Sequence, residues 1–445
     1  MPAALSEAWN RTVRAAGNAV ALVDAATGKT WSCTGLDVLA AEWQSRQAVP
    51  AGSTVVFAEP NGAVWLQLFI GLIKAGVVAV PVDPAEPAAA RQALAAAVGA
   101  DFLWHDGRLE ATGAKRRRHR DGRCLIKLTS GSTGAPRALV FTDDQILADA
   151  RQICATMRIR PGDMNLGLIP FGHSYGLGNL VVPLLAQGTA VICGVSALPQ
   201  AIAAAIERWR PTVFPAVPAL LRALVEADIA PEQLRSLRTV ISAGAPLGPE
   251  IARAFHKKFR LKIHNFYGCS ETGGISYDRT GTATLSGRSA GTPLRGVELA
   301  FTRGRRFLVR SPAVFSINNR LARRGRGRHR PADLGRLDER GELVLLGRSG
   351  RLVKIGGRRI DPGEIEAALR RLPGVREAFV AADPARGETL AAVVAGSLAA
   401  GAIRLALRER LAPWKIPRRL HVLPEFPLTA RGKTDVRRLH ALLGR

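Results

Sequence analysis

The sequence is poor in acidic and aromatic residues. Its 445 residues include 36 Asp and Glu against 63 Lys and Arg, which gives a formal net charge of +27, and aromatic residues make up only 5%. A field of this sign attracts polyanions such as nucleotides, acidic proteins or nucleic acid. A solvated arginine-rich surface explains the same excess without any partner. The charge therefore bears on partners and solubility and leaves the fold open.

The chain also lacks paired cysteines, a membrane span and an apolar leader. Its five cysteines form no CxxC pair, which argues against a zinc site or a disulfide framework and fits a reducing cytoplasm. The most apolar stretch, residues 64–78, is interrupted by Gln67 and Lys74 and is shorter than the ~20 residues that a spanning helix needs. The N-terminal MPAALSEAWNRTVRAAG has no apolar core of a signal peptide. These features predict a cytoplasmic protein.

What the sequence does contain is apolar material in a strand–helix rhythm. Hydrophobic residues make up 47%, and the length favours two or three packed units. Short apolar runs alternate with amphipathic stretches from residue 53 to 347, which predicts parallel sheets covered by helices. The expected strands are 54–58, 77–82, 164–170, 189–193, 212–216, 237–243 and 261–266, and the expected helices are 64–74, 143–155, 176–187, 197–209, 218–227 and 248–259.

The pattern of expected strands and helices changes after Gly291. Closely spaced short strands are expected at 297–302, 306–310 and 342–346, followed by helices at 362–371, 401–411 and 434–443 and strands at 377–382 and 389–394. We predict an α/β fold: a large N-terminal domain of parallel sheets covered by helices with a small β-subdomain (1–347), a glycine-rich hinge (348–352) and a small mobile α+β C-terminal domain (353–445). The arginine-rich segments 115–120 and 320–330 are expected to be surface loops of unassigned role.

One stretch points to anion binding. LTSGSTGAPR, residues 128–137, combines two glycines with hydroxyl side chains and a final Arg137, so that backbone N–H groups can wrap an anion. The loop is not a Walker A motif, because GxxxxGK[ST] is absent from the chain. It resembles the phosphate-binding signature of the adenylate-forming superfamily, which includes acyl- and aryl-coenzyme A ligases, peptide-synthetase adenylation domains and luciferases.

Further motifs resemble this superfamily in its own order along the chain. They cover roughly residues 50 to 440 and include NGAVWLQLFIGLIKAGVVAVPVDP (61–84), LIPFGHSYGLGN (168–179), VISAGAPLGPE (240–250), NFYGCSETGG (265–274), ADLGRLDERGELVLLGR (332–348) and PLTARGKTDVRRL (427–439). So many motifs in one order identify the chain as a member of the superfamily.

The resemblance implies ATP and Mg²⁺ as ligands. When a carboxylate attacks the α-phosphorus of ATP, catalysis depends on alignment, fixed donors and a metal ion. Tyr267 would stack on adenine, Asn265 would meet its amino edge, Ser270 would touch the α-phosphate and Glu271 would coordinate magnesium. The remaining nucleotide-binding residues implied are Thr129, Ser130, Gly131, Ser132, Thr133, Gly134, Arg137, Phe266 and Gly268.

Later motifs complete the implied catalytic set. Asp333 and Arg348 would bind the ribose hydroxyls, and Lys433 would bridge the α-phosphate and the attacking carboxylate. For thioester formation, Lys354, Gly356 and Gly357 would line a narrow channel for a pantetheine arm, since any side chain would block it. The acceptor is then coenzyme A or the phosphopantetheine of an acidic acyl carrier protein.

The motifs say less about which carboxylic acid the chain would activate. Amino-acid-activating relatives hold the substrate ammonium with an Asp near a position where this chain has Gly172, His173 and Ser174. This favours an aryl or fatty acid. His173 resembles the gating residue of coenzyme A ligases, and Gly244, Ala245 and Pro246 would form one wall of the pocket.

Several positions depart from the family pattern. Arg137 replaces the usual Lys, Ala138 stands where Gly is common, and Gly350 occupies a hinge position that usually holds Asp or Lys. The TGD triplet has become Pro331–Ala332–Asp333, the segment 316–330 lacks the usual GY, and the region before the phosphate loop is short. None of these changes removes a core catalytic group.

Three functions remain open at this stage. A coenzyme A ligase is the leading interpretation, transfer to a carrier protein is the alternative, and a non-catalytic nucleotide- or nucleic-acid-binding relative comes third. The arginine runs lack the interleaved aromatics that stack on bases, so nucleic acid is not expected as a partner. The sequence does not indicate the oligomeric state.

Overall fold

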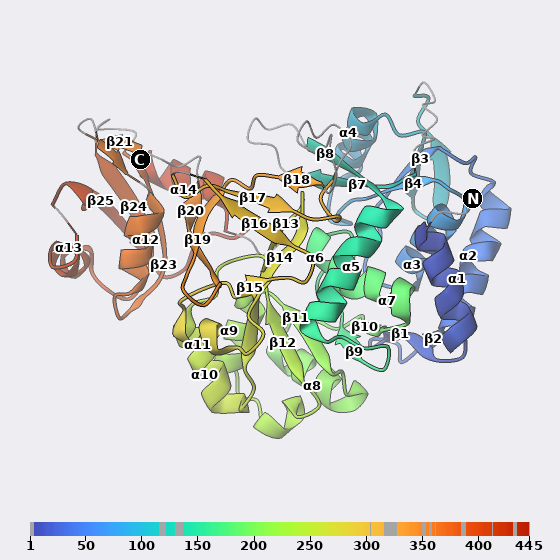
Figure 1. Ribbon diagram of the computed structural model, residues 1–445, viewed down its shortest axis with the longest axis horizontal. Helices are drawn as coiled ribbons and strands as arrows, with labels where there is room; N and C mark the ends of the chain where they lie inside the picture. Colours follow the sequence, from blue (N-terminus) through green and yellow to red (C-terminus); the bar gives the residue numbers. More distant parts are fainter. Residues whose placement is uncertain are drawn as a thin grey trace. The chain divides into compact units, whose positions relative to one another are not determined.

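The computed structural model describes residues 4–114, 122–129, 137–302, 304–315, 327–348, 353–355, 358–360, 362–383, 389–411, 413–429 and 434–444 (Figure 1). The chain divides into two compact units. The larger unit comprises Met1–Ala300 and Leu308–His329, and the smaller unit comprises Phe301–Phe307 and Arg330–Arg445. The domain boundaries predicted from sequence stay a prediction, and residues 349–352 of the predicted hinge lie outside the described residues.

A nine-stranded sheet forms the centre of the larger unit. Its middle strands are parallel, and an antiparallel strand or hairpin closes each edge. In spatial order the strands are β15 (Thr292–Pro293), β14 (Gly273–Tyr277), β13 (Ile263–Cys269), β12 (Thr239–Ser242), β11 (Val213–Ala216), β9 (Met164–Leu166), β10 (Ala190–Cys193), β1 (Val20–Asp24) and β2 (Thr30–Ser32).

A six-stranded sheet in the same unit repeats this plan. Strands β5, β3, β4 and β7 are parallel, and β6 and β8 are antiparallel at the two edges. The spatial order is β6 (Arg108–Ala111), β5 (Phe102–His105), β3 (Thr54–Phe57), β4 (Val78–Pro81), β7 (Arg123–Thr129) and β8 (Arg137–Thr142).

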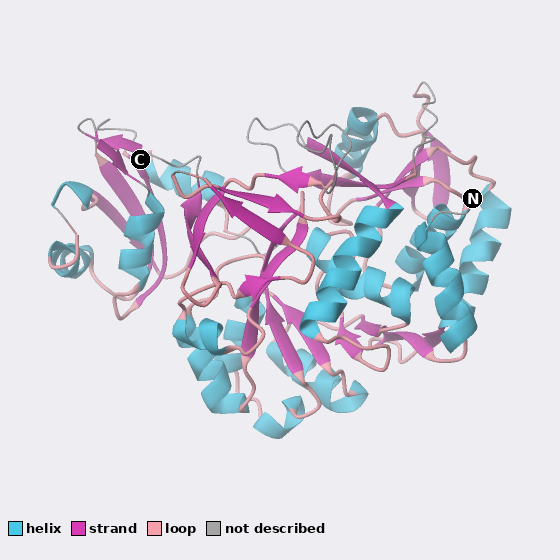
Figure 2. Ribbon diagram, in the orientation of Figure 1, coloured by secondary structure: helices cyan, strands magenta, loops and turns pink. Residues whose placement is uncertain are grey.

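Helices cover both sheets (Figure 2), and several bury an apolar face against them. Buried residues of α8, α9 and α10 pack on one face of the nine-stranded sheet, and α4 packs on the six-stranded sheet. The helices of this unit are α1 (Ala4–Ala16), α2 (Cys33–Gln47), α3 (Ala63–Lys74), α4 (Ala88–Val98), α5 (Asp143–Met157), α6 (Ser174–Gly176), α7 (Val182–Gln187), α8 (Pro199–Trp209), α9 (Pro218–Glu226), α10 (Pro249–Phe259) and α11 (Thr282–Ser286). A π-helical turn at Leu177–Val181 joins α6 to α7.

Local sequence sets the ends of several of these helices. Helices α8, α9 and α10 begin with Pro199, Pro218 and Pro249, where the missing N–H costs nothing. A capping box formed by Thr142 and Gln145 starts α5. Thus α5 begins directly where β8 ends, which brings its first turn close to the strand that follows the predicted phosphate loop.

The smaller unit is built from small sheets. Strands β19 (Asp333–Leu337) and β20 (Leu343–Arg348) form one antiparallel pair, and β21 (Val353–Ile355) and β22 (Arg358–Ile360) form another. A third sheet orders β23 (Val375–Ala382), β24 (Leu390–Gly396) and β25 (Arg419–Leu423), with helices α12 (Pro362–Arg370), α13 (Ala400–Arg408) and α14 (Val436–Leu443). A further three-stranded sheet, most of whose residues belong to the larger unit, consists of β16 (Glu298–Phe301), β17 (Phe307–Arg310) and β18 (Arg328–His329).

The predicted fold class is confirmed as an α/β arrangement with large sheets followed by a region of small sheets. The antiparallel edges are an addition to the predicted parallel sheets. Segment 115–120 and residues 320–326 of the second arginine-rich segment lie outside the described residues. Among the residues that the structure describes, no helix is long and apolar enough to cross a membrane.

Candidate active site

The predicted nucleotide and acid segments follow neighbouring parallel strands of the nine-stranded sheet. Residues 168–179 follow β9, Gly244–Pro246 follow β12, and Asn265–Glu271 lie at the end of β13. Carboxyl ends of parallel strands meet at one edge of a sheet, which is where α/β proteins bind ligands. Tyr175, from the segment after β9, reaches the neighbouring strands at this edge. Its hydroxyl lies 3.4 Å from the Ala216 carbonyl oxygen and 3.3 Å from that of Ile241.

A tight turn after β13 positions the predicted metal ligand. Strand β13 is bulged between Tyr267 and Gly268 before β14 returns antiparallel to it. A Cβ at Gly268 would lie 2.4 Å from the carbonyl oxygen of Gly273, so the two strands approach closely enough to require glycine. The Phe315 N–H donates to the Glu271 carbonyl oxygen at 3.0 Å. The turn carrying Ser270 and Glu271 is thus fixed from two sides.

The backbone of Asn265 is held by a buried carboxylate. Asp278 accepts hydrogen bonds from the N–H groups of Gly281 (2.9 Å) and Thr284 (2.7 Å) and from the Thr284 hydroxyl (2.8 Å). The Thr284 oxygen in turn accepts from the Asn265 N–H at 2.9 Å. Asp278 therefore anchors the residue predicted to meet adenine.

Asn61 holds the loop that leads to His173. Its side-chain amide donates to the carbonyl oxygens of Gly167 (3.0 Å) and Ile169 (2.8 Å), and its Oδ1 accepts from the Phe171 N–H (2.7 Å). Asn61 follows β3 of the six-stranded sheet, whereas the loop follows β9 of the nine-stranded sheet. The Asn61 side chain therefore connects the end of β3 in one sheet to the loop after β9 in the other. This loop leads to the half-buried His173.

Helix α5 organises the site through a polar face that sequence analysis did not single out. Gln145 donates to the Val314 carbonyl oxygen (2.9 Å), Asp149 accepts from the Gly274 N–H (2.8 Å), and Thr156 accepts from the Arg295 N–H (3.0 Å). Gln152 donates to the Gly296 carbonyl oxygen and accepts from the Ser311 hydroxyl. The spacing of four, three and four residues places all of them on one helical face. That spacing was the available signal.

The two ends of the predicted phosphate loop are cross-strand partners, since Thr129 ends β7 opposite Arg137 in β8. The loop residues Ser130, Gly131, Ser132, Thr133 and Gly134 lie outside the described residues. The Arg137 guanidinium lies over the Phe315 ring at 5.6 Å. Lys127, which sequence analysis also passed over, is buried two residues before the end of β7 with its ammonium over the Phe141 ring at 4.3 Å.

Burial sets the protonation of these groups. It lowers the pKa of Lys127, an effect opposed chiefly by Asp149, and it raises the pKa of Asp149, opposed chiefly by Lys127. The two groups thus favour each other's charged form inside the unit. A positive charge beside the end of β7 suits an anionic ligand at this place.

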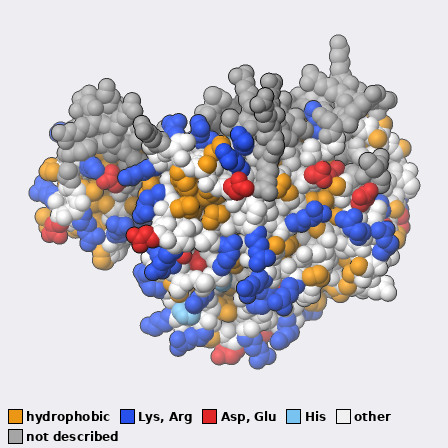
Figure 3. Space-filling model, viewed as in Figure 1, with side chains coloured by type: hydrophobic (Ala, Val, Ile, Leu, Met, Phe, Trp, Pro, Cys, Tyr) orange, Lys and Arg blue, Asp and Glu red, His pale blue; other side chains and the backbone are white. Residues whose placement is uncertain are grey.

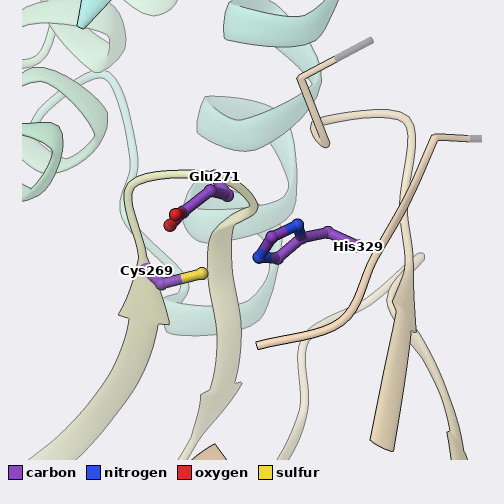
Figure 4. Close-up of side chains that lie close together, drawn as sticks. All are labelled: Cys269, Glu271 and His329. Atoms are coloured by element: carbon purple, nitrogen blue, oxygen red, sulfur yellow. The ribbon is translucent and has the colours of Figure 1, made fainter. Parts of the chain in front are cut away.

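Glu271 lies in a cluster with Cys269 and His329 (Figure 4). The Sγ atom, a carboxylate oxygen and an imidazole nitrogen all lie within 4.8 Å of one another, and all three residues are half-buried. Burial raises the pKa of the Cys269 thiol to about 12, with a further contribution from Glu271. Burial lowers the pKa of His329, partly offset by Glu271. Burial therefore favours the neutral form of the imidazole.

The Glu271 carboxylate supplies the one protein carboxylate that the predicted Mg²⁺ needs at least. Magnesium takes oxygen ligands and is commonly held by one or two carboxylates, with substrate phosphates and waters completing its shell. When bound, it would neutralise phosphate charge. The thiol and imidazole beside this carboxylate are not magnesium ligands by preference.

The smaller unit places the predicted ribose-binding residues together. Asp333 and Arg348 are direct partners across β19 and β20. The backbone of Lys354 lies in β21, whereas Gly356, Gly357 and Lys433 lie outside the described residues. The roles of all these residues stay predictions.

Comparison with known families now identifies the class of protein. The AMP-binding enzyme family matches residues 104–302, and the AMP-binding enzyme C-terminal domain matches residues 364–433. The chain belongs to the AMP-binding, adenylate-forming enzyme family, as predicted.

Two curated relatives differ in the acceptor that their names state. A long-chain-fatty-acid–CoA ligase of Bacillus subtilis (strain 168) is 28% identical over 71% of this chain and 61% of its own length. An L-proline–[L-prolyl-carrier protein] ligase of Streptomyces coelicolor is 29% identical over 70% of this chain and 64% of its own length. The chain thus spans less than two thirds of the length of either relative.

A solved structure supports the fold. ATP-bound MatB from Rhodopseudomonas palustris superposes with a TM-score of 0.84, covering 99% of both chains at 22% identity. At this identity the likeness defines the fold and leaves the substrate open.

Proposed function

We propose that the chain activates an aryl or fatty carboxylic acid with ATP, releases pyrophosphate and transfers the acyl group to the thiol of coenzyme A. The observation that carries the proposal is the convergence of three motif segments, 168–179, 244–246 and 265–271, at the carboxyl ends of β9, β12 and β13. Family membership supports adenylate formation, and relatives named as CoA ligases support the acceptor.

In this proposal the chain's own residues align the acid and the nucleotide. Tyr267 and Asn265 would hold adenine, and Arg137 with residues 129–134 would hold the terminal phosphates. Glu271 would bind magnesium, which neutralises charge on the phosphates. Lys433 would offset the repulsion between the carboxylate and the α-phosphate. Asp333 and Arg348 would hold the ribose, and Lys354, Gly356 and Gly357 would line the thiol channel.

The nature of the acid is argued from His173. The segment Gly172–Ser174 offers no carboxylate for a substrate ammonium. The loop is held by the Asn61 hydrogen bonds, and the rings of Tyr175 and Phe266 lie 5.9 Å apart. A pair of aromatic rings in this region and no carboxylate in Gly172–Ser174 favour an acid without a charged amine.

Pyrophosphate release tests the proposal. Wild-type protein would be assayed with ATP, magnesium and a panel of aryl and fatty acids, each with and without coenzyme A. We expect acid-dependent release that turns over many times only with coenzyme A. Lys433→Ala should lower the rate by about 100-fold or more, whereas Lys257→Ala on the exposed face of α10 should match the wild type.

Two outcomes would change the proposal. Acid-dependent release of a single equivalent that coenzyme A does not affect would assign the acceptor as a carrier protein. Failure to bind ATP together with no release for any acid would refute the enzyme and leave a non-catalytic relative.

A further inference from the structure

The cluster of Cys269, Glu271 and His329 brings together three different donor types that the sequence keeps apart. Cys269 ends β13, Glu271 lies in the next turn and His329 ends β18. Figure 4 shows the thiol, carboxylate and imidazole gathered in one space. Sixty positions separate the cysteine from the histidine, so no spacing pattern reveals the set. All three residues belong to the larger unit.

The donor set selects a class of metal ion. A thiolate, an imidazole and one carboxylate are ligands of zinc and of similar divalent transition metals, whereas magnesium and calcium bind oxygen alone. Three protein ligands with a fourth position left open is the usual plan of a non-structural zinc site. The absence of a CxxC pair therefore does not decide the question of metal binding here.

The distances are close to those that such an ion requires. Zinc–ligand bonds of about 2.0 to 2.3 Å in tetrahedral geometry place the ligand atoms roughly 3.3 to 3.6 Å apart. The three donor atoms lie within 4.8 Å of one another. Contraction by about 1 to 1.5 Å is within reach of side-chain rotation without movement of the strands.

The surroundings contact all three ligand residues. The Phe315 N–H donates to the Glu271 carbonyl oxygen, and the Phe315 ring stands 5.8 Å from the His329 ring at 61°. The Thr272 hydroxyl lies 3.2 Å from the Cys269 Sγ. His329 is also fixed in register opposite Val309 of β17. Ordered supports of this kind reduce the cost of assembling a metal site.

We propose that Cys269, Glu271 and His329 bind one divalent transition-metal ion of the zinc class and leave one coordination position open. Binding replaces the Cys269 thiol proton, which passes to solvent, so that thiolate and carboxylate together balance the charge of the ion. The site shares Glu271 with the predicted magnesium site, and the two ions would therefore exclude each other. The proposal needs neither ATP nor an acid, so its test does not depend on the proposed function.

Cobalt(II) is the probe that tests it. Metal-free full-length protein, prepared by dialysis against a chelator, would be titrated with cobalt alone. We expect one cobalt ion per chain, with the near-ultraviolet thiolate charge-transfer absorption and the intense visible bands of four-coordinate cobalt. Zinc should then abolish both. A folded wild-type protein whose cobalt spectrum lacks the thiolate absorption would overturn the proposal.

Variants assign the ligands. Cys269→Ser should lose the thiolate absorption, and His329→Gln should weaken cobalt binding by at least about tenfold. Cys193→Ser and His421→Gln are matched controls elsewhere in the chain and should keep the wild-type spectrum and affinity. Circular dichroism checks that each variant is folded. Cobalt bound as tightly by folded Cys269→Ser or His329→Gln as by the wild type would also overturn the proposal.

Discussion

Asp143 shows how one buried group makes stability depend on pH. It is the first residue of α5 and only 6% exposed, and Oδ1 has no hydrogen-bond partner among the described residues. Burial raises the pKa of its carboxyl to about 6, opposed by a hydrogen bond with Cys124. The folded state therefore holds the proton more tightly than the unfolded state, whose pKa is near 3.8.

The sign of the effect follows from linkage. A raised pKa in the folded state contributes stability that is complete below pH 3.8 and is lost as the pH rises through about 6. Asp143→Asn keeps a neutral side chain at every pH. Between about pH 4.5 and about pH 7.5 the unfolding free energy of the variant should therefore rise by roughly 2 kcal/mol relative to that of the wild type.

Denaturant unfolding across that pH range measures this difference. Asp144→Asn, at the exposed neighbouring carboxyl, is the control and should differ from the wild type by less than about 0.5 kcal/mol throughout. A difference between Asp143→Asn and the wild type that is constant with pH would contradict the argument.

Among elements, the loop between β9 and α6 depends on a side chain from the other sheet. Replacing Asn61 by Asp turns the donating amide into an oxygen that faces the carbonyl oxygens of Gly167 and Ile169. We expect a loss of about 2 to 4 kcal/mol in unfolding free energy. Because the loop leads to His173, acid-dependent pyrophosphate release should fall as well.

Comparison of two Asn61 variants distinguishes the effect of oxygen–oxygen repulsion from the effect of losing the three hydrogen bonds. Asn61→Ala removes the three hydrogen bonds without adding a charge and should lose less than Asn61→Asp. Asn18→Asp, at an exposed position, should leave both stability and activity unchanged. Equal behaviour of Asn61→Asp and Asn61→Ala would show that the carbonyl oxygens are not the cause.

The strand–helix alternation was predictable where an element has its own pattern. Strands β3, β4, β10, β11 and β12 are mainly apolar and buried along their whole length, as strands inside a parallel sheet are, and all were predicted. The edge strands were missed because pairing creates them. Strand β14 begins with Gly273 and Gly274 and gains its strand conformation from β13, and β1 and β2 are a short hairpin at the opposite edge.

The residues of the candidate site were likewise predictable only in part. Motif residues such as Glu271 and Asn265 were found because their neighbours in sequence carry the signal. The polar face of α5 was visible as a spacing, but a polar helical face normally predicts contact with water, and here Gln145, Asp149 and Gln152 are buried. The approach of His329 to Cys269 depends on the path of the chain through β17 and β18, which no local pattern encodes.

Across the whole molecule, positive charge dominates. Lys and Arg side chains spread over much of the face shown in Figure 3, and α10 alone carries Arg253, Lys257 and Lys258 before Arg260. With a net charge of +27, anionic partners are attracted at long range. This attraction is screened as ionic strength rises.

Ionic strength should therefore affect acyl transfer to the acceptor more strongly than it affects adenylate formation. Raising the salt from about 0.05 M to about 0.5 M shortens the screening length several-fold. The apparent kcat/KM for the anionic acceptor should fall by about tenfold. The maximal rate of pyrophosphate release at saturating ATP and acid should change by less than about twofold. Steady-state assays at matched pH measure both, and equal slopes with salt would argue against steering of the acceptor.

The chain passes from the larger unit to the smaller at residue 301, returns at 308 and leaves again after His329. A fragment cut at residue 302, where the larger family match ends, would keep Cys269 and Glu271 but lose the returning strand segment with Phe315 and His329. During synthesis on the ribosome, the larger unit likewise cannot close until residue 329 has emerged. Truncation and split-protein designs should therefore cut after position 329, where the larger unit is complete.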